Sequence, residues 1–350
     1  MTTPVFVVGT GRCGSTMLSD MLKKHPAILN LSELFGALTD LATLIPQAFP
    51  DGIIDASHFW DILTYPHPKS NLAVRYGLSS ADPILTRIII QPRFKAGLPP
   101  IMTVLRRITG NDLEVVFDEM QSFVTAQSPA PIQHHYLRLF TWLQERFERK
   151  KWVERSVSLR FIPYLRKTFP DARFIHIVRD GRNTAISMSR HPGFRMLQLT
   201  SQLVEKLGVD PFESQDRSRI ELLSDELRCL LPENFNASVF RNYSPPLAHY
   251  GRYWSEEIVS GLHVLAETPS QQVLTIHYED ILKEPSIAIT QLITFIDPVF
   301  VDEQWLDSVV PMVKSARSSW QALPAEEQEQ LQAACDPGFA ALEDFQVSRI

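Results

Sequence analysis

Cysteine is scarce in this chain. Three cysteines occur among the 350 residues, at positions 13, 229 and 335. Three widely separated cysteines provide neither a disulfide framework nor the paired spacing of a zinc site. The ten histidines contain no HExxH motif, and the neighbours His134 and His135 are too few to hold a metal. We therefore expect no disulfide and no metal cofactor.

Long apolar runs and an excess of positive charge are also missing. The sequence has no stretch of 18 apolar residues and no cleavable signal, which favours a cytoplasmic protein over a membrane-spanning or secreted one. The 34 basic and 40 acidic residues give a net charge of −6, which argues against general nucleic-acid binding. With 44% hydrophobic residues, the chain can bury a large core. We expect one α/β domain over residues 1–350.

What the sequence does have is an apolar strand that leads into a glycine-rich turn. Residues 4–8 (PVFVV) precede Gly-Thr-Gly-Arg-Cys-Gly-Ser-Thr at 9–16, and apolar residues then recur at helical spacing until Pro26. Free backbone N–H groups and the helix dipole at such a helix start favour phosphate or sulfate. Arg12 adds a planar fork of donors that can hold two anion oxygens. This segment predicts an anion site.

Spacing alone leaves several interpretations of this segment open. Gly9-x-Gly11-x-x-Gly14 matches the dinucleotide-binding pattern, and residues 27–33 could supply its second strand and acidic residue. The segment also nearly matches the P-loop pattern, but Ser15 takes the place of the lysine, which argues against a magnesium-triphosphate site. A tight turn that binds nothing would need the same glycines for positive φ.

A second strand-to-helix segment lies deeper in the chain. Residues 174–178 (FIHIV) are typical of a buried parallel strand, and residues 183–189 are helical in pattern. Arg179 falls at the carboxyl edge of the strand, where open α/β sheets bind ligands. Ser187 follows about two helical turns later and can add a hydroxyl to the same anion. A dinucleotide enzyme has no need of this arrangement.

Together the two segments resemble the sulfotransferases that use 3′-phosphoadenosine-5′-phosphosulfate (PAPS), in the branch with arginine in the first loop. The resemblance implies a three-layer α/β fold of the P-loop-NTPase type with a central parallel sheet. It implies PAPS as sulfuryl donor, adenosine 3′,5′-bisphosphate (PAP) as product, and no metal. The implied 5′-phosphosulfate loop comprises Gly11, Arg12, Cys13, Gly14, Ser15 and Thr16. Arg179 and Ser187 correspond to the 3′-phosphate pair.

Two later segments extend this resemblance. Tyr278, within VLTIHYEDIL at 273–282, is similar to the family's strand followed by Tyr-Glu-Asp-Leu, and the resemblance implies that it binds the donor. Residues 319–324 (SWQALP) are similar to the family's closing segment. Lys314 and Arg317 precede it and could close over the 3′-phosphate, although solvated charges are the ordinary role of such residues.

Glu33 is the candidate general base. The resemblance implies this role, because a glutamate at this spacing after the loop arginine removes the acceptor proton in the arginine-type branch. The alternative is local: Ser32 caps a following helix and Glu33 complements the helix dipole. Arg12 and the loop amides would stabilise the charge that develops on the departing phosphate.

Arg155 and Cys13 carry weaker signals. Residues 152–155 (WVER) resemble the family's Trp-x-Glu-Lys-Thr-Pro stretch, with Arg155 at the lysine position. Arg155 could contact the sulfate or the acceptor, or form an ion pair at the edge of the core. Cys13 could be a stabilised, oxidation-sensitive thiolate or an inert small residue of the loop.

The segments around 35–132 and 193–249 are expected to be helical insertions that cover the site. Lid helices select acceptors and exclude water. Candidate acceptor-binding aromatics within or near them are Phe59, Trp60, Phe194 and Tyr253. We expect a small-molecule acceptor with a hydroxyl or amine, and a carbohydrate, a lipid or a peptide tyrosine stays open as an alternative acceptor. A kinase with a degenerate P-loop and a non-catalytic nucleotide-binding protein are the alternative functions.

Overall fold

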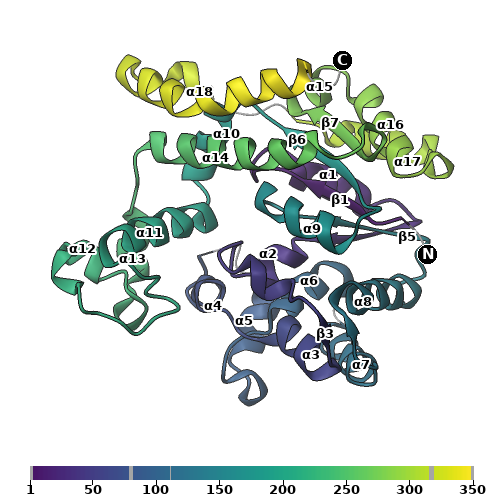
Figure 1. Cartoon of the computed structure of the whole chain (residues 1–350), viewed down its shortest axis with the longest axis horizontal. Coiled ribbons are helices and arrows are strands. Elements are labelled where there is room, and N and C mark those ends of the chain that lie inside the picture. The colour runs from purple at the N-terminus through teal and green to yellow at the C-terminus, as the bar shows by residue number, and fades with distance from the viewer. Residues whose placement is uncertain (1–2, 79–81, 111, 315–318, 348–350) are drawn as a thin grey trace.

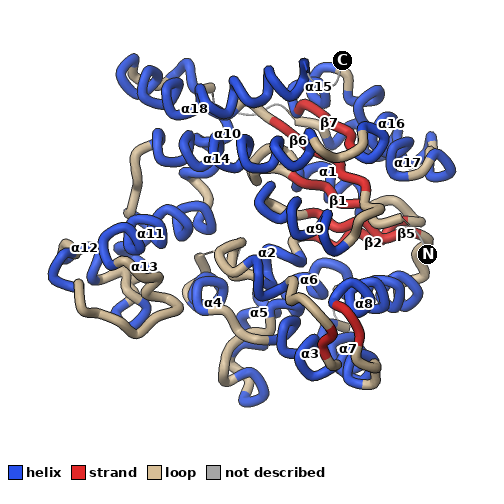
Figure 2. Tube along the Cα trace, in the orientation of Figure 1, coloured by secondary structure: helices blue, strands red, loops and turns tan. Residues whose placement is uncertain are grey.

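A five-stranded parallel sheet forms the centre of the protein. The computed structural model describes residues 3–78, 82–110, 112–314 and 319–347. The strand order is β2-β5-β1-β6-β7, and every neighbouring pair is parallel (Figures 1 and 2). The strands are β1 (Val5–Val8), β2 (Ile28–Ser32), β5 (Lys151–Arg155), β6 (Arg173–Val178) and β7 (Val273–His277). This arrangement confirms the predicted α/β fold with a central parallel sheet.

Side chains alternate between the two faces of the sheet and bury helices on both. In β1, Val5 and Val7 pack with α1 (Ser15–Lys23), α15 (Tyr278–Lys283), α16 (Pro285–Ile296) and α17 (Glu303–Val309). Phe6 and Val8 face the opposite core, with α9 (Ile162–Thr168), α10 (Gly181–Ser189), α14 (Leu247–Ala266) and α18 (Ala325–Val347). This period-two alternation produces the three layers.

The first insertion is helical, as predicted, and lies below the sheet in Figure 1. Its helices are α2 (Leu34–Leu38), α3 (Ala56–Thr64), α4 (Pro68–Arg75), α5 (Pro83–Ile89), α6 (Pro100–Thr109) and α7 (Leu113–Thr125). A short antiparallel pair, β3 (Ile53–Ile54) with β4 (Ala130–Pro131), precedes α8 (Ile132–Arg146), which leads back to β5.

The second insertion contributes most of a small apolar cluster, which Leu78 of the first insertion joins. It contains α11 (Pro192–Leu207), α12 (Asp225–Arg228) and α13 (Ala237–Asn242), which share an apolar cluster separate from the two sheet cores. Figure 1 shows these helices at the left, beyond the carboxyl ends of the strands. Helix α11 ends at Gly208, whose φ of 78° is left-handed and therefore suits glycine.

The described residues lack a membrane-spanning helix and a cluster of metal ligands. None of their helices has the length and apolarity needed to cross a bilayer. Nor do they contain a group of three or more His, Cys, Asp or Glu side chains able to hold a metal ion.

Candidate active site

The turn after β1 has the geometry of an anion-binding loop. Gly11, Arg12 and Gly14 have positive φ values of 72°, 57° and 97°. Gly14 is the N-cap of α1 and has no side chain to cap the helix, and the Ser15 N–H lies beside the Cys13 thiol. A Cβ on Gly14 would lie 2.4 Å from a ring carbon of Tyr278, so glycine is required by both conformation and space.

The two predicted anion-binding segments meet at this turn. The Arg12 Nε–H donates to Ser187 Oγ across 3.1 Å, and Arg179 Nη1 donates to the Arg12 carbonyl oxygen across 3.1 Å. The Arg179 guanidinium also lies 4.7 Å from the centre of the Tyr278 ring. Residues that directly follow β1, β6 and β7, together with Ser187 of α10, therefore converge on one edge of the sheet.

The charges at this point favour an anion. Burial, followed by the charge of Arg179, lowers the pKa of Arg12 below its ordinary value. Each guanidinium is thus held in the field of another cation beside an uncapped helix start. A bound anion would relieve that repulsion and accept hydrogen bonds from the N–H groups at the helix start.

Cys13 lies inside the loop as a fully buried residue. Burial raises the pKa of its thiol despite the nearby Ser15 groups and Arg155. A protonated, inaccessible thiol is a poor nucleophile and a poor target for oxidants. The structure therefore supports the inert interpretation of Cys13.

Glu33 is held by two arginines. Its Oε1 accepts from Arg155 Nη2 and its Oε2 accepts from Arg107 Nη2, both across 2.6 Å. Burial would raise the pKa of this carboxyl, but the charges and hydrogen bonds of the two arginines outweigh it and lower the pKa to about 2. Glu33 is consequently ionised at neutral pH.

The helix-cap interpretation of Ser32 and Glu33 is wrong. Ser32 is the last residue of β2, and Glu33 occupies the N-cap position of α2 with a φ of 64° and no side-chain cap bond. The Ser32 hydroxyl instead accepts from Arg155 Nη2 across 2.8 Å and from Arg107 Nη1 across 3.0 Å. Both side chains therefore belong to the arginine cluster rather than to the helix start.

Arg155 links this cluster to the anion loop. Its side chain is 2% exposed, and its Nη1 donates to Ser15 Oγ, in the first turn of α1, across 3.1 Å. Of its two predicted roles, the ion pair is the one that the structure contains, with Glu33 as the partner. The guanidinium still lines the adjoining cavity.

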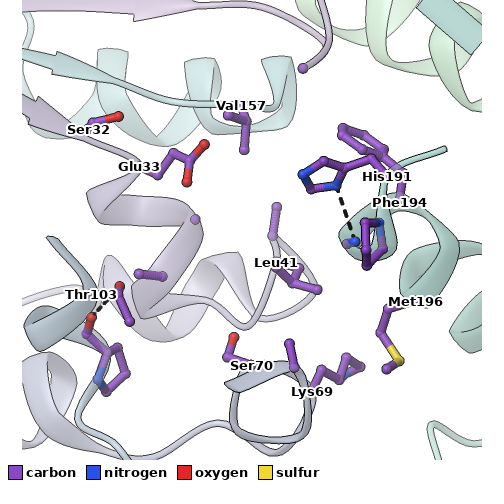
Figure 3. A pocket seen from close by; sticks show the side chains of 18 of the residues that line it. Ser32, Glu33, Leu41, Lys69, Ser70, Thr103, Val157, His191, Phe194 and Met196 are labelled. Carbon is purple, nitrogen blue, oxygen red and sulfur yellow. Dashed lines mark hydrogen bonds between the residues drawn. The ribbon is translucent and has the colours of Figure 1, made fainter. Parts of the chain in front are cut away.

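A cavity of about 690 Å³ opens beside the loop (Figure 3). Gly11, Arg12 and Glu33 lie along it, together with residues of α2, α4, α6 and α11. Its apolar side chains include Leu41, Val74, Leu85, Leu98, Val157, Met196 and Leu197. It thus joins the sheet edge to both helical insertions.

Two of the four predicted acceptor aromatics line this cavity and two do not. Phe194 and Tyr253 line it. Phe59 is fully buried in the core, where its ring lies 5.0 Å from that of His135, and Trp60 packs against the Phe117 ring at 5.3 Å. The predicted role of Phe59 and Trp60 is wrong, because α3 turns both rings onto α7 and α8 instead of toward the cavity.

The C-terminal segment returns to the loop edge. The Lys314 carbonyl oxygen accepts from the Tyr278 hydroxyl across 3.4 Å, and the Trp320 N–H donates to Asn183 Oδ1 across 3.1 Å. The Arg182 guanidinium lies 4.0 Å from the Trp320 ring centre. Arg317, the other predicted cation of this segment, lies outside the described residues.

The model of the sulfotransferase family matches residues 4–237. The chain belongs to the sulfotransferase family. No curated protein sequence matches it. Among solved structures, it is similar to a sulfotransferase domain of the Synechococcus PCC 7002 olefin synthase, with 14% identity, 97% of this chain and 96% of that chain covered, and a TM-score of 0.41. It is also similar to sulfotransferase STF9 of Mycobacterium avium (16% identity, 98% and 76% covered, TM-score 0.44) and to a sulfotransferase of Alicyclobacillus acidocaldarius (17%, 98% and 95%, 0.40).

Two residues of this sulfotransferase site escaped the sequence analysis. Arg107 comes from the last turn of α6, where two adjacent arginines look like ordinary solvated charges. His191 precedes Pro192, a pair that marks a helix boundary in the sequence, and it is the N-cap of α11 and lines the cavity. The His-Pro pair at a helix start was a usable signal for a cap, but no sequence pattern connects either residue with Glu33.

Proposed function

We propose that this protein transfers the sulfuryl group of PAPS to a hydroxyl or amine of a small-molecule acceptor, releasing PAP. The observation that carries the proposal is the convergence of Arg12, Arg179 and Ser187 on one uncapped helix start. Membership of the sulfotransferase family supports the transfer, and the two anion-binding segments support a donor that is charged at both ends.

The loop holds the reacting end of the donor. We expect the N–H groups of Ser15 and Thr16, in the first turn of α1, to donate to the 5′-phosphosulfate together with the Arg12 guanidinium. As the sulfur–oxygen bond to the phosphate breaks, negative charge grows on that phosphate. Fixed donors aimed at this charge stabilise the transition state more than the ground state.

Arg179 and Ser187 hold the 3′-phosphate at the other end. The Tyr278 ring supports Arg179 from one side, and the bond from Arg179 to the Arg12 carbonyl connects the two phosphate subsites. Binding at the 3′ end thereby also fixes the position of the catalytic loop. This coupling explains how a nucleotide feature remote from sulfur contributes to positioning.

Glu33 accepts the proton of the acceptor. The acceptor oxygen or nitrogen forms the new bond to sulfur, the bond from sulfur to the 5′-phosphate breaks, and the proton passes to the carboxylate. A carboxylate with a pKa of about 2 is a weak base, so proton transfer follows most of the bond formation, when that proton has become strongly acidic. The two arginines keep the carboxylate charged and oriented until then.

The cavity supports a small molecule as acceptor. Its volume of about 690 Å³ and its many apolar side chains suit a compact, partly apolar ligand. We propose that the helices of 35–132 and 193–249 act as the lid, since both insertions supply cavity residues.

Calorimetry with adenosine 3′,5′-bisphosphate, ATP and NAD tests the donor site, and transfer of labelled sulfate from PAPS to a panel of acceptors tests the reaction. We expect binding to prefer the bisphosphate. Magnesium-dependent ATP turnover would indicate a kinase instead. Binding of the bisphosphate without transfer to any acceptor would indicate a non-catalytic nucleotide-binding protein.

A further inference from the structure

His191 has a fixed orientation at the entrance of α11. Its Nδ1 accepts the N–H of Gly193 across 3.2 Å, which makes the imidazole the N-cap of the helix. A ring nitrogen that accepts a hydrogen bond carries no proton, so the neutral ring bears its proton on Nε2. The cap thereby fixes the tautomer as well as the ring position.

The ring is also packed against the anion loop through Phe194. The His191 and Phe194 rings meet edge to face, with centres 5.7 Å apart. A Cβ on Gly11 would lie 2.4 Å from Phe194 Cζ, so this aromatic pair lies directly against the loop backbone. The position of His191 is consequently tied to the loop that carries Arg12.

His191 and Glu33 face each other across the cavity. Figure 3 shows them on opposite walls, with the Glu33 carboxylate and the second ring nitrogen of His191 turned toward the space between them. Burial, followed by the charge of Arg12, lowers the pKa of His191, while the charge of Glu33 opposes this effect. The ring is therefore neutral at pH 7, and within the described part of the chain its Nε2 has no hydrogen-bond partner.

We propose that His191 Nε2–H donates a hydrogen bond to the oxygen of the acceptor hydroxyl while Glu33 accepts the hydrogen of that same hydroxyl. A hydroxyl both donates and accepts hydrogen bonds, so one acceptor hydroxyl can bond to His191 and Glu33 at the same time. An ammonium group offers only donors and leaves the Nε2–H unpaired. The inference rests on the proposed sulfuryl transfer and narrows its acceptor from hydroxyl or amine to hydroxyl.

The same geometry excludes His191 as the base. To take a proton at Nε2, the ring would need its own proton on Nδ1, where it would meet the N–H of Gly193. In the transfer step, the acceptor oxygen bonds to sulfur, the bond from sulfur to the phosphate breaks, and the proton goes to Glu33. His191 keeps its proton throughout and positions the attacking oxygen.

Two substitutions separate the cap from the donor. Asparagine places its side-chain oxygen near the Nδ1 position and is itself a favoured N-cap. His191→Asn therefore keeps the bond to Gly193 but loses the Nε2–H donor that faces the cavity. Glutamine reaches the Nε2 position with an amide N–H, so His191→Gln restores the donor at the expense of the cap.

The acceptors are 1-octanol, 2-phenylethanol and cyclohexylmethanol, paired with the primary amines of the same carbon skeletons.

We expect wild-type enzyme to transfer sulfate to the alcohols faster than to the amines at pH 7. His191→Asn should lower kcat/KM for alcohols about tenfold, lower the alcohol-to-amine ratio equally, and leave bisphosphate binding unchanged. His191→Gln should recover alcohol transfer to within about threefold of wild type. A purely structural role would instead lower alcohol and amine transfer alike.

Three results would overturn the inference. They are unchanged alcohol transfer in His191→Asn, a loss of a thousandfold or more that His191→Gln does not recover, and wild-type transfer to amines at least as fast as to alcohols. Each leaves sulfuryl transfer itself standing. A wild-type enzyme that binds the bisphosphate but sulfates no alcohol or amine contradicts the proposed function, and the inference with it.

Discussion

Arg155 and Glu33 are joined twice, once through the backbone and once through their side chains. The Glu33 N–H donates to the Arg155 carbonyl oxygen across 2.7 Å, which continues the β2–β5 register in which Ser32 is opposite Arg155. Arg155 Nη2 then donates to Glu33 Oε1 across 2.6 Å. The position of the carboxylate is therefore set by the end of the sheet, which holds a side chain more tightly than a free loop would.

Replacing Glu33 by glutamine should abolish most of the transfer. Glu33→Gln preserves size and hydrogen-bonding geometry but cannot take up the acceptor proton. We expect kcat to fall about a hundredfold, the lower end of general-base effects, because a base with a pKa of about 2 contributes less than one matched to neutral pH. Labelled-sulfate transfer at saturating PAPS measures the loss.

The exposed Glu303 on α17 provides the control for this change. Glu303→Gln should transfer sulfate at the wild-type rate, and both variants should bind adenosine 3′,5′-bisphosphate normally. Undiminished transfer by Glu33→Gln would exclude proton removal by this residue.

Removing Arg107 should raise the pKa of Glu33. Both the charge of Arg107 and its hydrogen bond lower the pKa of Glu33. Arg107→Met should therefore raise the pKa of the Glu33 carboxyl by about one pH unit or more. A depressed pKa stabilises the fold above the ordinary value of 4.5, and this stabilisation is lost as pH falls toward 2. Arg107→Met should lose this stabilisation at a higher pH than the wild-type protein does. A ¹³C NMR titration of the Glu33 carboxyl measures the shift.

Arg106 is the matched control, because it precedes Arg107 in the last turn of α6 but pairs with Asp82 across 2.9 Å. Arg106→Met should leave the Glu33 titration in place. Equal shifts in the two variants would show that the effect is general to the helix and not a property of the Arg107 pair.

Local sequence patterns predicted the parts of this site that lie at strand ends. In residues 4–23 and 174–189, the apolar run, the turn residues and the helical repeat are adjacent in the chain, so each signal reinforces the next. The structure has β1 followed by α1, and β6 followed by α10, in these places. Their convergence also follows from sequence, because parallel strands bring their carboxyl ends to one edge.

The insertions could not be predicted to the same depth. Their helices were recognisable by period, but Phe59, Trp60 and Phe194 all look alike in sequence as aromatics of amphipathic helices. Which of them reaches the cavity depends on how α3, α7 and α11 pack against distant partners. Arg107 depends on the same long-range packing, since 74 positions separate it from Glu33.

Arg12 should be the most sensitive residue of the loop. Arg12→Ala removes the guanidinium that we propose holds the leaving phosphate, and also the bond to Ser187, so we expect transfer to fall a hundredfold to a thousandfold or more. Arg12→Lys keeps the positive charge but loses the paired N–H donors of the guanidinium, and it should recover part of the transfer rate. Wild-type turnover by Arg12→Ala would remove it from the proposed mechanism.

Arg179 should matter more than Ser187 for recognition of the 3′-phosphate. Arg179→Ala removes a charged donor and its hydrogen bond to the Arg12 carbonyl oxygen. It should weaken bisphosphate binding by more than about 1.5 kcal/mol. Ser187→Ala removes one hydroxyl and should cost less. Calorimetry with adenosine 5′-phosphate, which lacks the 3′ group, provides the comparison. If wild-type enzyme binds both nucleotides equally, neither residue contacts a 3′-phosphate.

Lys69 should prove a strong stabilising residue at the far wall of the cavity. Its fully buried ammonium lies 2.8 Å from Asp210 Oδ2 and 3.4 Å from Asp40 Oδ2, and the Asp40 side chain is also fully buried. Asp40 and Lys69 belong to the first insertion and Asp210 to the second, so this cluster connects the two parts of the proposed lid. Lys69→Met leaves a buried carboxylate without its cation and should lower the free energy of unfolding by about 3–5 kcal/mol.

The ion pair of Lys167 with Asp51 is the comparison for Lys69, because it joins the same residue types across 2.5 Å with side chains 68% and 81% exposed. Lys167→Met should cost less than about 1 kcal/mol, since water screens such a pair. Urea unfolding at pH 7 measures both changes. Similar small losses in the two variants would mean that the Lys69 cluster does not stabilise the fold, and that the two insertions are held together by the apolar cluster of α11 to α13 instead.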